Sequence, residues 1–431
     1  MEKLSRVGNN IVGSEIIKIS QQIKEISKTK PVANLTIGDF NSITWPIPAK
    51  LKQYIEQCYE DDLTNYPNSQ GELNLRESVS KHIKNQFGVD YSPEEILIGG
   101  GVRPLIYTVY KATTNPATPK ANGYVPADNV IYPTPSWNNN HYCFLHGVEK
   151  NEIECLPENS FFPTVNDVAT RINDNTSLVC ICSPQNPTGR VIDTEVLKGI
   201  CELIVNENNL RKNQVGSRPL YLFFDQIYSD ITQNGKFVHP IKLCPEIRDY
   251  LICADGISKS LNATGVRVGW LFGPKDIIGK MTEILSHIGA WAPKPEQHGL
   301  DKYMRENYND YIWHIDYVKT EYEWITHKIC DAIEKMKEKG FRVDCQRPEG
   351  GIYISVYLDY VHSFTSTEDY ISFLINECGL GIVPFEYFGS KQKGWFRISI
   401  GNISDSNLDE IIDKITGAVV KSNVFVNSMV F

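Results

Sequence analysis

Hydrophobic positions along the chain follow two patterns, one helical and one continuous. Isoleucine recurs at helical spacing between residues 16 and 26, which predicts an amphipathic helix, and residues 72–87 have a similar helical pattern. Farther along, five continuous apolar runs are separated by helical stretches. The runs cover residues 130–133, 177–182, 221–225, 250–255 and 268–273. Continuous apolar runs of this length are typical of a parallel sheet that is covered on both faces.

The pattern changes in the last third of the chain. Residues 296–339 predict a long helix that ends at Gly340, and the segments beyond it alternate between strands and helices. We therefore predict an α/β protein with a large domain, in which a mostly parallel sheet is sandwiched by helices. A smaller α+β domain is built from both termini. The expected limits are 1–45 for the N-terminal arm and helix that join the small domain, 46–320 for the large domain and 321–431 for the C-terminal small domain.

Composition narrows the classes of function. The 431 residues suggest roughly two to three domains. With 43 basic and 52 acidic residues the net charge is −9, which argues against a general nucleic-acid binder. No apolar run approaches the ~20 residues of a membrane helix, and the first residues lack the apolar core of a signal peptide. The eleven scattered cysteines predict buried thiols in a reducing compartment, the cytoplasm, and the nine histidines show no metal-ligand spacing.

A lysine follows the fourth apolar run. Lys259 lies in DGISKSLNATGVRVGW, between small residues, with Arg267 eight residues later. A lone lysine is usually a solvated surface residue. However, a lysine whose pKa is lowered from about 10.4 by desolvation or by a nearby cation can form an imine with an aldehyde. Arg267 can hold a phosphate group through two parallel hydrogen bonds.

Polar side chains also follow the second and third runs. Asn186 lies in CSPQNPTGR after the second run, and Asp225 ends the third run with Tyr228 three residues later. Each has an ordinary interpretation, as a turn residue or as a helix N-cap. Ligands of open α/β sheets bind outside the carboxyl ends of the strands. Three successive strand ends that carry an amide, a carboxylate with a phenol, and a lysine therefore indicate one shared site.

The three motifs together, NPTG, D-x-x-Y and SK-x₇-R-x-G, resemble those of class I/II aminotransferases of the fold-type I pyridoxal-phosphate family. The resemblance runs from about residue 34 to residue 401. It implies that Lys259 binds pyridoxal 5′-phosphate as an imine and later carries the proton between the substrate Cα and the cofactor. It also implies that Asp225 pairs with the pyridinium nitrogen, that Tyr228 and Asn186 bind the phenolic oxygen, and that Arg267 binds the phosphate.

The resemblance extends to further cofactor residues. The turn GGGVR resembles the family's phosphate cup, where backbone amides at a helix start bind an anion. The amides concerned are those of Gly101, Val102 and Arg103. The cup lacks the usual small hydroxylic residue, and Gly256 stands where some relatives carry a phosphate-binding serine, so Ser258 is expected to compensate. Trp137, in PTPSWNNN, resembles the aromatic residue that stacks on the cofactor ring, although a buried core tryptophan is about as common.

Substrate and subunit contacts are also implied. Arg397, in WFRISIG, matches the arginine that binds the substrate α-carboxylate, for which the planar guanidinium is well suited. Gly38 resembles the glycine whose backbone approaches the same carboxylate. Tyr66 resembles the tyrosine that reaches the phosphate of the partner subunit, which implies a homodimer with shared active sites. A surface tyrosine in a turn is the alternative.

The side chain of the substrate is less well defined. Dicarboxylate-specific relatives use a second arginine shortly before a Pro-containing segment, but here that place holds Gly289, with Lys294 as a possible substitute. This argues against strict aspartate specificity. An aromatic or apolar pocket is suggested by Trp291, Phe40 and Tyr387, which are equally suited to packing.

The leading hypothesis is an aminotransferase that exchanges an amino group between an L-amino acid and a 2-oxo acid in two ping-pong half-reactions. A β-lyase or an amino-acid decarboxylase would use the same lysine and cofactor, so the motifs do not separate these activities. Some transcription regulators carry an aminotransferase-like domain behind a basic winged helix. Only some 33 residues precede the aminotransferase-like part here, without a basic recognition helix, which argues against that class.

Overall fold

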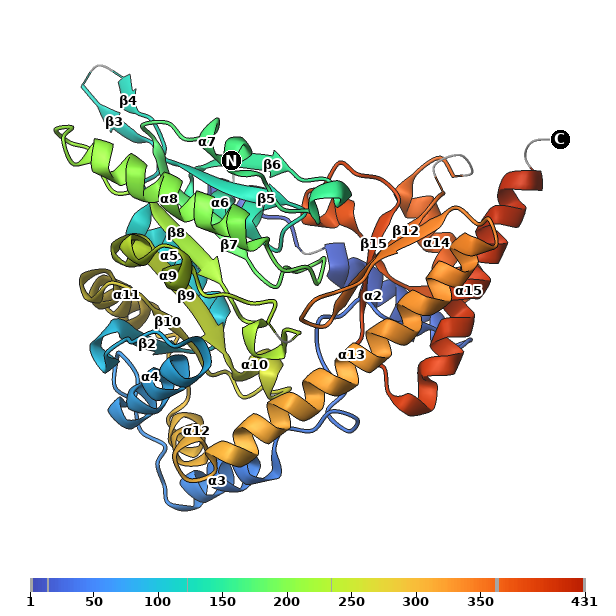
Figure 1. Ribbon diagram of the computed structural model, residues 1–431, viewed down its shortest axis with the longest axis horizontal. Coiled ribbons are helices and arrows are strands. Elements are labelled where there is room, and N and C mark those ends of the chain that lie inside the picture. Colours follow the sequence, from blue (N-terminus) through green and yellow to red (C-terminus); the bar gives the residue numbers. More distant parts are fainter. Residues whose placement is uncertain (1–2, 14, 122, 234, 361–363, 429–431) are drawn as a thin grey trace.

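A seven-stranded sheet lies at the centre of the larger of two domains in the computed structural model, which describes residues 3–13, 15–121, 123–233, 235–360 and 364–428 (Figure 1). Its strands are β2 (Ile96–Gly99), β5 (Asn129–Thr134), β6 (Glu149–Glu154), β7 (Thr176–Cys182), β8 (Tyr221–Asp225), β9 (Leu251–Gly256) and β10 (Gly269–Phe272). The order is β2-β10-β9-β8-β7-β5-β6. All five predicted runs are strands, and the predicted α/β architecture is confirmed.

One strand departs from the expected direction. The run at 268–273, expected among the parallel strands, forms β10, which is antiparallel to both of its neighbours. The connection from β9 contains only a four-residue helix. A parallel return usually needs a full helix that crosses one face of the sheet. Without such a helix, the chain returns beside β9 in the opposite direction.

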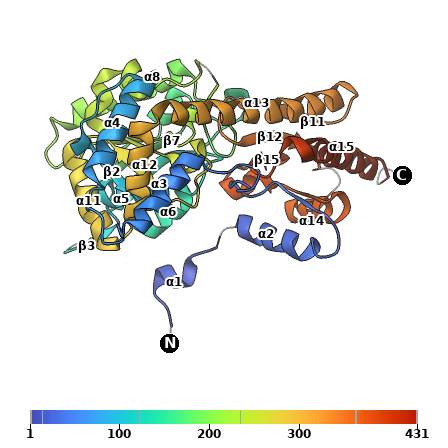
Figure 2. The same ribbon diagram turned by 90° about the horizontal axis from the view of Figure 1, so that it is seen from below.

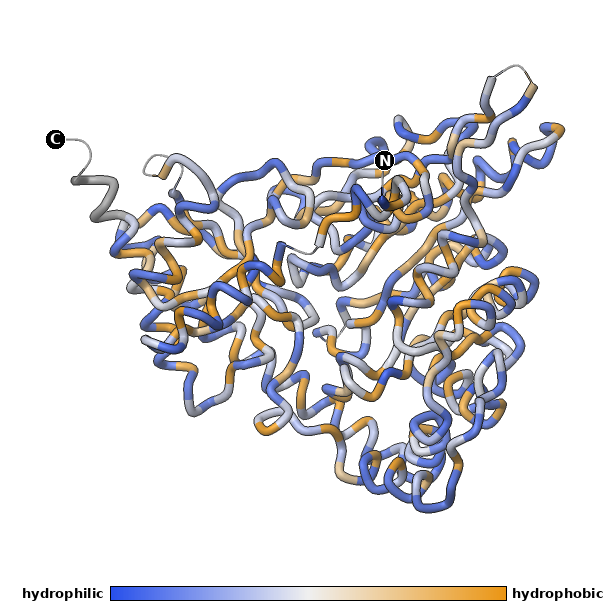
Figure 3. Tube along the Cα trace, turned by 180° about the vertical axis from the view of Figure 1, so that it is seen from behind, coloured by the Kyte–Doolittle hydropathy of each residue, from blue (hydrophilic) through white to orange (hydrophobic). Residues whose placement is uncertain are grey.

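Helices cover both faces of this sheet. They are α3 (Ala49–Glu60), α4 (Leu73–Phe87), α5 (Val102–Thr113), α6 (Asn139–His146), α7 (Val165–Ala169), α8 (Thr194–Arg211), α9 (Pro240–Leu243), α10 (Ile257–Ser260), α11 (Lys275–Ile288) and α12 (Lys294–Glu306). Successive strand residues point to opposite faces, so Leu178 and Cys180 of β7 pack with α5 and α11, whereas Val179 and Ile181 pack with α4 and α8. Figure 3 shows hydrophobic and hydrophilic residues interspersed along the helical turns of the chain.

Short elements complete the large domain. The hairpin β3 (Thr118–Lys120) and β4 (Gly123–Val125) projects from it. The 3₁₀ helices among the described residues are η1 (Pro93–Glu95), η2 (Pro157–Asn159), η3 (Ser229–Ile231), η4 (Pro245–Tyr250) and η5 (Phe385–Phe388).

The small domain contains segments from both ends of the chain, as expected. Its main sheet has the order β11-β12-β15-β14, and a second, two-stranded sheet pairs β1 with β13 in parallel. The strands are β1 (Ala33–Asn34), β11 (Val343–Gln346), β12 (Tyr353–Leu358), β13 (Leu380–Gly381), β14 (Val383–Pro384) and β15 (Trp395–Ser399). Its helices are α2 (Glu15–Ile26), α14 (Thr367–Cys378) and α15 (Asp405–Ser428), and the short helix α1 (Arg6–Asn10) precedes them in the chain. Ile19 and Ile23 of α2 pack against Ile371 and Ile375 of α14. Figure 2 shows α1 standing away from the rest.

The long helix α13 (Tyr308–Glu338) runs from the large domain into the small one (Figure 1). Its N-terminal part contributes Ile315 to the core of the large domain, and its later part contributes Val318 to the core of the small domain. The single helix expected over 296–339 is in fact two helices, because Asn307 leaves the helical conformation between α12 and α13. No glycine or proline marks that break. No helix in the described ranges is long and apolar enough to cross a membrane.

Candidate active site

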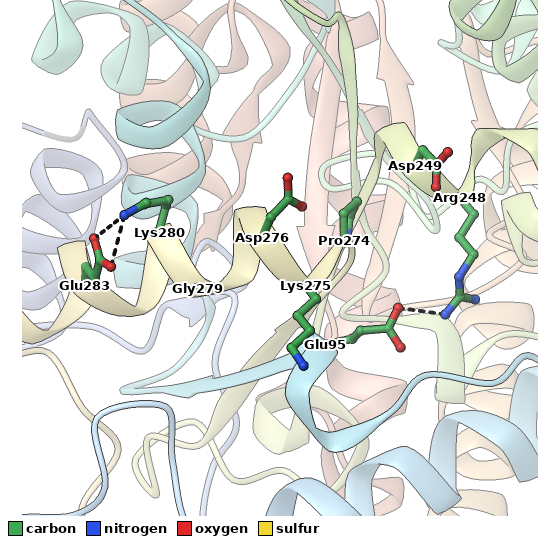
Figure 4. Close-up of a pocket in the computed structure, with 9 residues that line it drawn as sticks. All are labelled: Glu95, Arg248, Asp249, Pro274, Lys275, Asp276, Gly279, Lys280 and Glu283. Carbon is green, nitrogen blue, oxygen red and sulfur yellow. Dashed lines mark hydrogen bonds and ion pairs between the residues drawn. The ribbon is translucent and has the colours of Figure 1, made fainter.

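Two hollows differ in their chemistry. The first, of about 680 Å³, is bordered by charged side chains of the surface around α11, of which Arg248 pairs with Glu95 at 2.8 Å and Lys280 with Glu283 at 3.0 Å (Figure 4). It contains none of the expected site residues. The second, of about 430 Å³, lies between the domains and is lined by nearly all of them. The lining residues that sequence predicted are Gly38, Val102, Arg103, Trp137, Asn186, Asp225, Tyr228, Ser258, Lys259, Arg267 and Arg397.

The polar residues of three strand ends meet in this hollow. β7, β8 and β9 are neighbours in the sheet, and Cys182, Asp225 and Ala254 lie side by side in register. Asn186 therefore follows one strand, Asp225 ends the next, and Lys259 follows the third at the same edge. The sheet geometry brings together the amide, the carboxylate and the amine, as the strand-end argument predicted.

The Lys259 amine lies among aromatic rings and one carbonyl. Its Nζ donates a hydrogen bond to the Gly38 carbonyl at 2.6 Å and lies 5.6 Å from the ring centre of Phe40. Burial lowers the pKa of the Lys259 amine, and Tyr353 and Asp39 partly oppose that change. A lowered pKa increases the neutral fraction of the amine, which is the reactive form toward a carbonyl group.

Asp225 presents a carboxylate without a cationic partner to the hollow. Burial raises the pKa of Asp225 to about 6, whereas the Ile227 amide, which donates to Oδ1 at 3.2 Å, and the Lys259 charge lower it. In the described part of the chain no lysine, arginine or histidine nitrogen pairs with it within 4 Å. A buried acid of this kind suits a ligand that brings its own N–H group.

Arg267 holds its guanidinium against the turn before α5. Its Nη2 donates to the Gly100 carbonyl at 2.8 Å and its Nη1 to the Thr264 carbonyl at 2.6 Å. A Cβ on Gly101 would lie 2.1 Å from Nη2, and Gly101 has a φ of 84°, so this position requires glycine on both counts. Burial lowers the pKa of Arg267, and the charge of Arg103 lowers it further.

The start of α5 forms an anion cradle beside that guanidinium. The first amides of a helix have no partner within the helix, and those of Val102 and Arg103 lie at this place. The Gly101 amide, which the sequence placed in the cradle, instead donates to the Gly99 carbonyl at 2.7 Å. The Arg103 guanidinium lies over Trp137, with Cζ 4.5 Å from the ring centre.

Arg397 is buried in the middle of the small-domain sheet. β15 lies between β12 and β14, so Arg397 is on a central strand, and only 2% of it is exposed. Its Nη1 donates to Asn186 Oδ1 at 3.0 Å, its Nη2 donates to the Thr36 carbonyl at 2.5 Å, and the rings of Tyr353 and Phe388 lie on it. Its Nε has no hydrogen-bond partner among the described residues. A buried guanidinium with a spare donor is suited to bind a carboxylate.

Tyr353 is a site residue that the sequence analysis missed. It begins β12 in the small domain, yet its hydroxyl lies 3.1 Å from the Tyr228 hydroxyl and 3.4 Å from Asn186 Nδ2 in the large domain. A Cβ on Gly38 would lie 2.2 Å from the Tyr353 hydroxyl oxygen, so glycine makes room for this contact. The segment GIYISVYLDY predicted only a strand. The Pro/Gly turn PEGG just before it marks where the strand begins, but not that Tyr353 meets the other domain.

The mouth of the hollow differs from the expected aromatic pocket. Trp291 and Tyr387 are not among the lining residues, and Lys294 instead donates to Asn65 at the surface. The apolar side chains that line the mouth belong to Ile16, Ile17 and Ile37. In the sequence, these three isoleucines have only the pattern of packing residues, so nothing there indicates a site.

Tyr66 lies outside the hollow. Its side chain is 83% exposed and meets Trp291 edge to face at 5.5 Å between ring centres. Within one chain the structure therefore does not bring Tyr66 to the other site residues.

Comparisons with known proteins agree with this arrangement. Residues 30–415 match the family model described as aminotransferase class I and II. The chain belongs to the class I and II aminotransferase family. An aspartate aminotransferase of Geobacillus stearothermophilus is 26% identical over 96% of this chain and 98% of its own length. A probable N-acetyl-LL-diaminopimelate aminotransferase of Bacillus subtilis is 25% identical over 94% of each chain.

The fold of this aminotransferase is also that of solved relatives. The structure of an aspartate aminotransferase from Thermus thermophilus with maleate superimposes with a TM-score of 0.83 at 22% identity and covers 97% of this chain and all of that one. The chain is accordingly a transaminase that uses pyridoxal phosphate bound to a lysine. The alternative of a β-lyase or a decarboxylase is not favoured, because the relatives named above are aminotransferases.

The aminotransferase hollow fits that cofactor. An amine, an unpaired carboxylate and an anion cradle with a guanidinium lie in one cavity, and these groups match the aldehyde, the ring nitrogen and the phosphate of pyridoxal phosphate. No group of three or more His, Cys, Asp or Glu side chains arranged to hold a metal ion occurs in the described ranges.

Proposed function

We propose that this aminotransferase binds pyridoxal phosphate through Lys259 and moves an amino group from an L-amino acid to a 2-oxo acid in two half-reactions. The observation that carries the residue assignment is the convergence of Lys259, Asp225 and Arg397 on one hollow from three separate elements. Cofactor-binding roles are supported by the contacts of Asn186, Tyr228, Arg267, Trp137 and the first amides of α5. Ser258 lines the same hollow, so we assign it to the cofactor-binding residues as well.

Each residue has a defined task in this mechanism. The bound cofactor supplies an electron-withdrawing ring and the carbon that accepts the amino group. Asp225 holds the proton of the ring nitrogen, and Asn186 and Tyr228 donate to the phenolic oxygen. Arg397 clamps the substrate α-carboxylate next to the backbone of Gly38, which fixes the Cα–H bond near the lysine. Lys259, once free, takes the proton from the substrate Cα with its Nζ.

An absorption spectrum tests this function directly. The purified enzyme with pyridoxal phosphate is mixed with single amino acids in the absence of an acceptor. We expect the visible band to be replaced by the pyridoxamine form, and a 2-oxo acid to restore it. The hollow is lined by the three isoleucines named above and by Arg103. The amino acids tested therefore include aspartate, leucine and phenylalanine. A band that persists while ammonia or carbon dioxide is released would contradict amino transfer.

We also propose that the enzyme is a cytoplasmic homodimer in which Tyr66 reaches the phosphate site of the partner. The exposed Tyr66 and the exposed apolar residues of the N-terminal segment support this proposal, because a partner subunit would bury them; the apolar residues are Leu4, Val7, Ile11 and Val12. All eleven cysteines are free thiols, in keeping with a reducing compartment. Sedimentation equilibrium tests the assembly, and Tyr66→Phe is expected to weaken cofactor binding without dissociating the dimer. A monomer with full activity would contradict this proposal.

A further inference from the structure

A buried carboxylate lies directly behind the hollow. Asp255, near the end of β9, is 3% exposed and does not line the cavity. Three donors converge on it. The Gly256 amide donates to Oδ1 at 2.7 Å, while Gln226 Nε2 and the Ser229 hydroxyl donate to Oδ2 at 3.1 and 3.2 Å.

These donors belong to the two turns that carry the chemistry. Gln226 directly follows Asp225, and Ser229 directly follows Tyr228, so two of the bonds hold the first turn. The Gly256 amide begins the second turn, which places Lys259 three residues later. Asp255 is thus the side chain through which the first turn is hydrogen-bonded to the base of the second.

A second acid and several groups without partners surround Asp255. Asp230 lies in η3 and its Oδ2 is 3.4 Å from His82 Nε2 of α4, while His82 Nδ1 lies 3.2 Å from the Tyr308 hydroxyl of α13. Cys253 of β9 and Tyr311 of α13 also face this place. The buried polar atoms there that have no hydrogen-bond partner among the described residues include Asp230 Oδ1, Gln226 Oε1 and the Tyr311 hydroxyl.

We propose that Asp255 is a positioning residue that fastens the Lys259 turn to the turn of Asp225 and Tyr228 through the three hydrogen bonds that its carboxyl group accepts. Burial, followed by the charge of Asp230, raises the pKa of Asp255 well above its usual range, and the three donors partly oppose that change. The inference rests on the proposed role of Lys259 in cofactor binding. It adds a residue that acts through Lys259 and Tyr228 without touching the cofactor.

The test compares two changes at one position. Asp255→Asn keeps an acceptor for the Gly256 amide but replaces the oxygen that accepts from Gln226 and Ser229 with an N–H donor. Asp255→Ala removes all three bonds. Asp249→Asn is the matched control, because Asp249 is an exposed aspartate on the same domain. Each protein is examined for the affinity of pyridoxal phosphate, for the pH midpoint of the absorption band of the bound cofactor, and for the melting temperature of the cofactor-free form.

We expect Asp249→Asn to match the wild type within about twofold in cofactor affinity, with an unchanged pH midpoint. Asp255→Ala leaves buried donors unpaired and is expected to bind the cofactor about tenfold more weakly, with a shifted midpoint. Asp255→Asn keeps one of the accepted bonds and should lie between the wild type and Asp255→Ala. If Asp255→Ala retains the wild-type affinity and midpoint, Asp255 does not position the turns.

Two provisions keep the result decisive. Should Asp255→Ala not fold, Ser229→Ala removes one of the three bonds and is expected to shift the midpoint in the same direction by a smaller amount. An unshifted midpoint in that variant would overturn the inference. A wild-type enzyme that forms no cofactor band at all would instead contradict the role of Lys259, so failure of the proposed function is recognised before any variant is compared.

Discussion

The two walls of the hollow are built in different ways. The large domain contributes Asn186, Asp225 and Lys259 from strand ends, where each follows a buried apolar run. The small domain contributes Arg397 and Tyr353 from within its own sheet, each 2% exposed and bonded to residues of the other domain. The first wall carries the reactive groups on its own. In the proposed mechanism the second recognises the substrate, and it is complete only where the domains meet.

The largest effect is expected for the reactive wall. Lys259→Ala removes the only amine that the proposal assigns to proton transfer, so the rate of the amino-acid half-reaction should fall by about 10³-fold or more. Stopped-flow absorption with a saturating amino acid measures it. Lys294→Ala changes a lysine that bonds to Asn65 at the surface and serves as the control. A Lys259→Ala protein that still converts at the wild-type rate would contradict the assignment.

The recognition wall should respond in binding more than in rate. Arg397→Lys keeps a positive charge but loses the guanidinium fork, so we expect KM for the amino acid to rise by about 10- to 100-fold with a smaller change in kcat. Steady-state kinetics separates the two constants. A loss confined to kcat would place Arg397 in the chemistry instead of in recognition.

The reactive wall should also have a pH signature in the cofactor-free protein. Because the pKa of Asp225 is raised to about 6, the folded state binds more protons than the unfolded state between the two pKa values. Its contribution to stability is therefore present below the unfolded pKa and is lost as the pH rises through about 6. Asp225→Asn should reduce the loss of unfolding free energy between about pH 4.5 and about pH 7 by on the order of 1 to 2 kcal/mol.

Urea unfolding of both proteins at the two pH values measures that difference. Equal pH slopes for the wild type and Asp225→Asn would show that the carboxylate is not shifted. Asp249→Asn provides the matched control, because its carboxylate is exposed to solvent.

A smaller effect is expected where the walls touch. Tyr353→Phe removes the hydroxyl that lies near Tyr228 and Asn186 but keeps the ring on Arg397. Loss of one neutral hydrogen-bonding group should raise KM by about 3- to 10-fold. If kcat and KM are both unchanged while Arg397→Lys is impaired, recognition depends on the guanidinium of Arg397 and not on the Tyr353 hydroxyl.

The two walls also differ in how far the sequence revealed them. Asn186, Asp225 and Lys259 were found because apolar runs predict strands, and parallel strands end at one edge. Arg397 was found only through the family resemblance. Tyr353 was missed because a mid-chain tyrosine in an apolar strand has the pattern of a packing residue. Such contacts depend on the docking of two domains, which no local pattern encodes.

Other differences have equally local causes. The direction of β10 depends on the connection from β9, which contains only a four-residue helix. The break between α12 and α13 depends on the backbone of Asn307. Neither leaves a mark in hydrophobic periodicity. Asp255 carries no sequence signal either, because an aspartate beside a glycine at the end of a strand is typical of any turn.

The close approach of Gly38 and Tyr353 constrains how this lineage can change. A methyl group at position 38 would lie 2.2 Å from the phenol oxygen, so no larger residue is accepted while the tyrosine stays. Tyr353 must first be replaced by phenylalanine or a smaller residue. The protein with that single replacement is expected to bind the substrate carboxylate more weakly. The two positions, 315 residues apart in the sequence, are therefore inherited as a pair, and among descendants of this chain their substitutions should occur together.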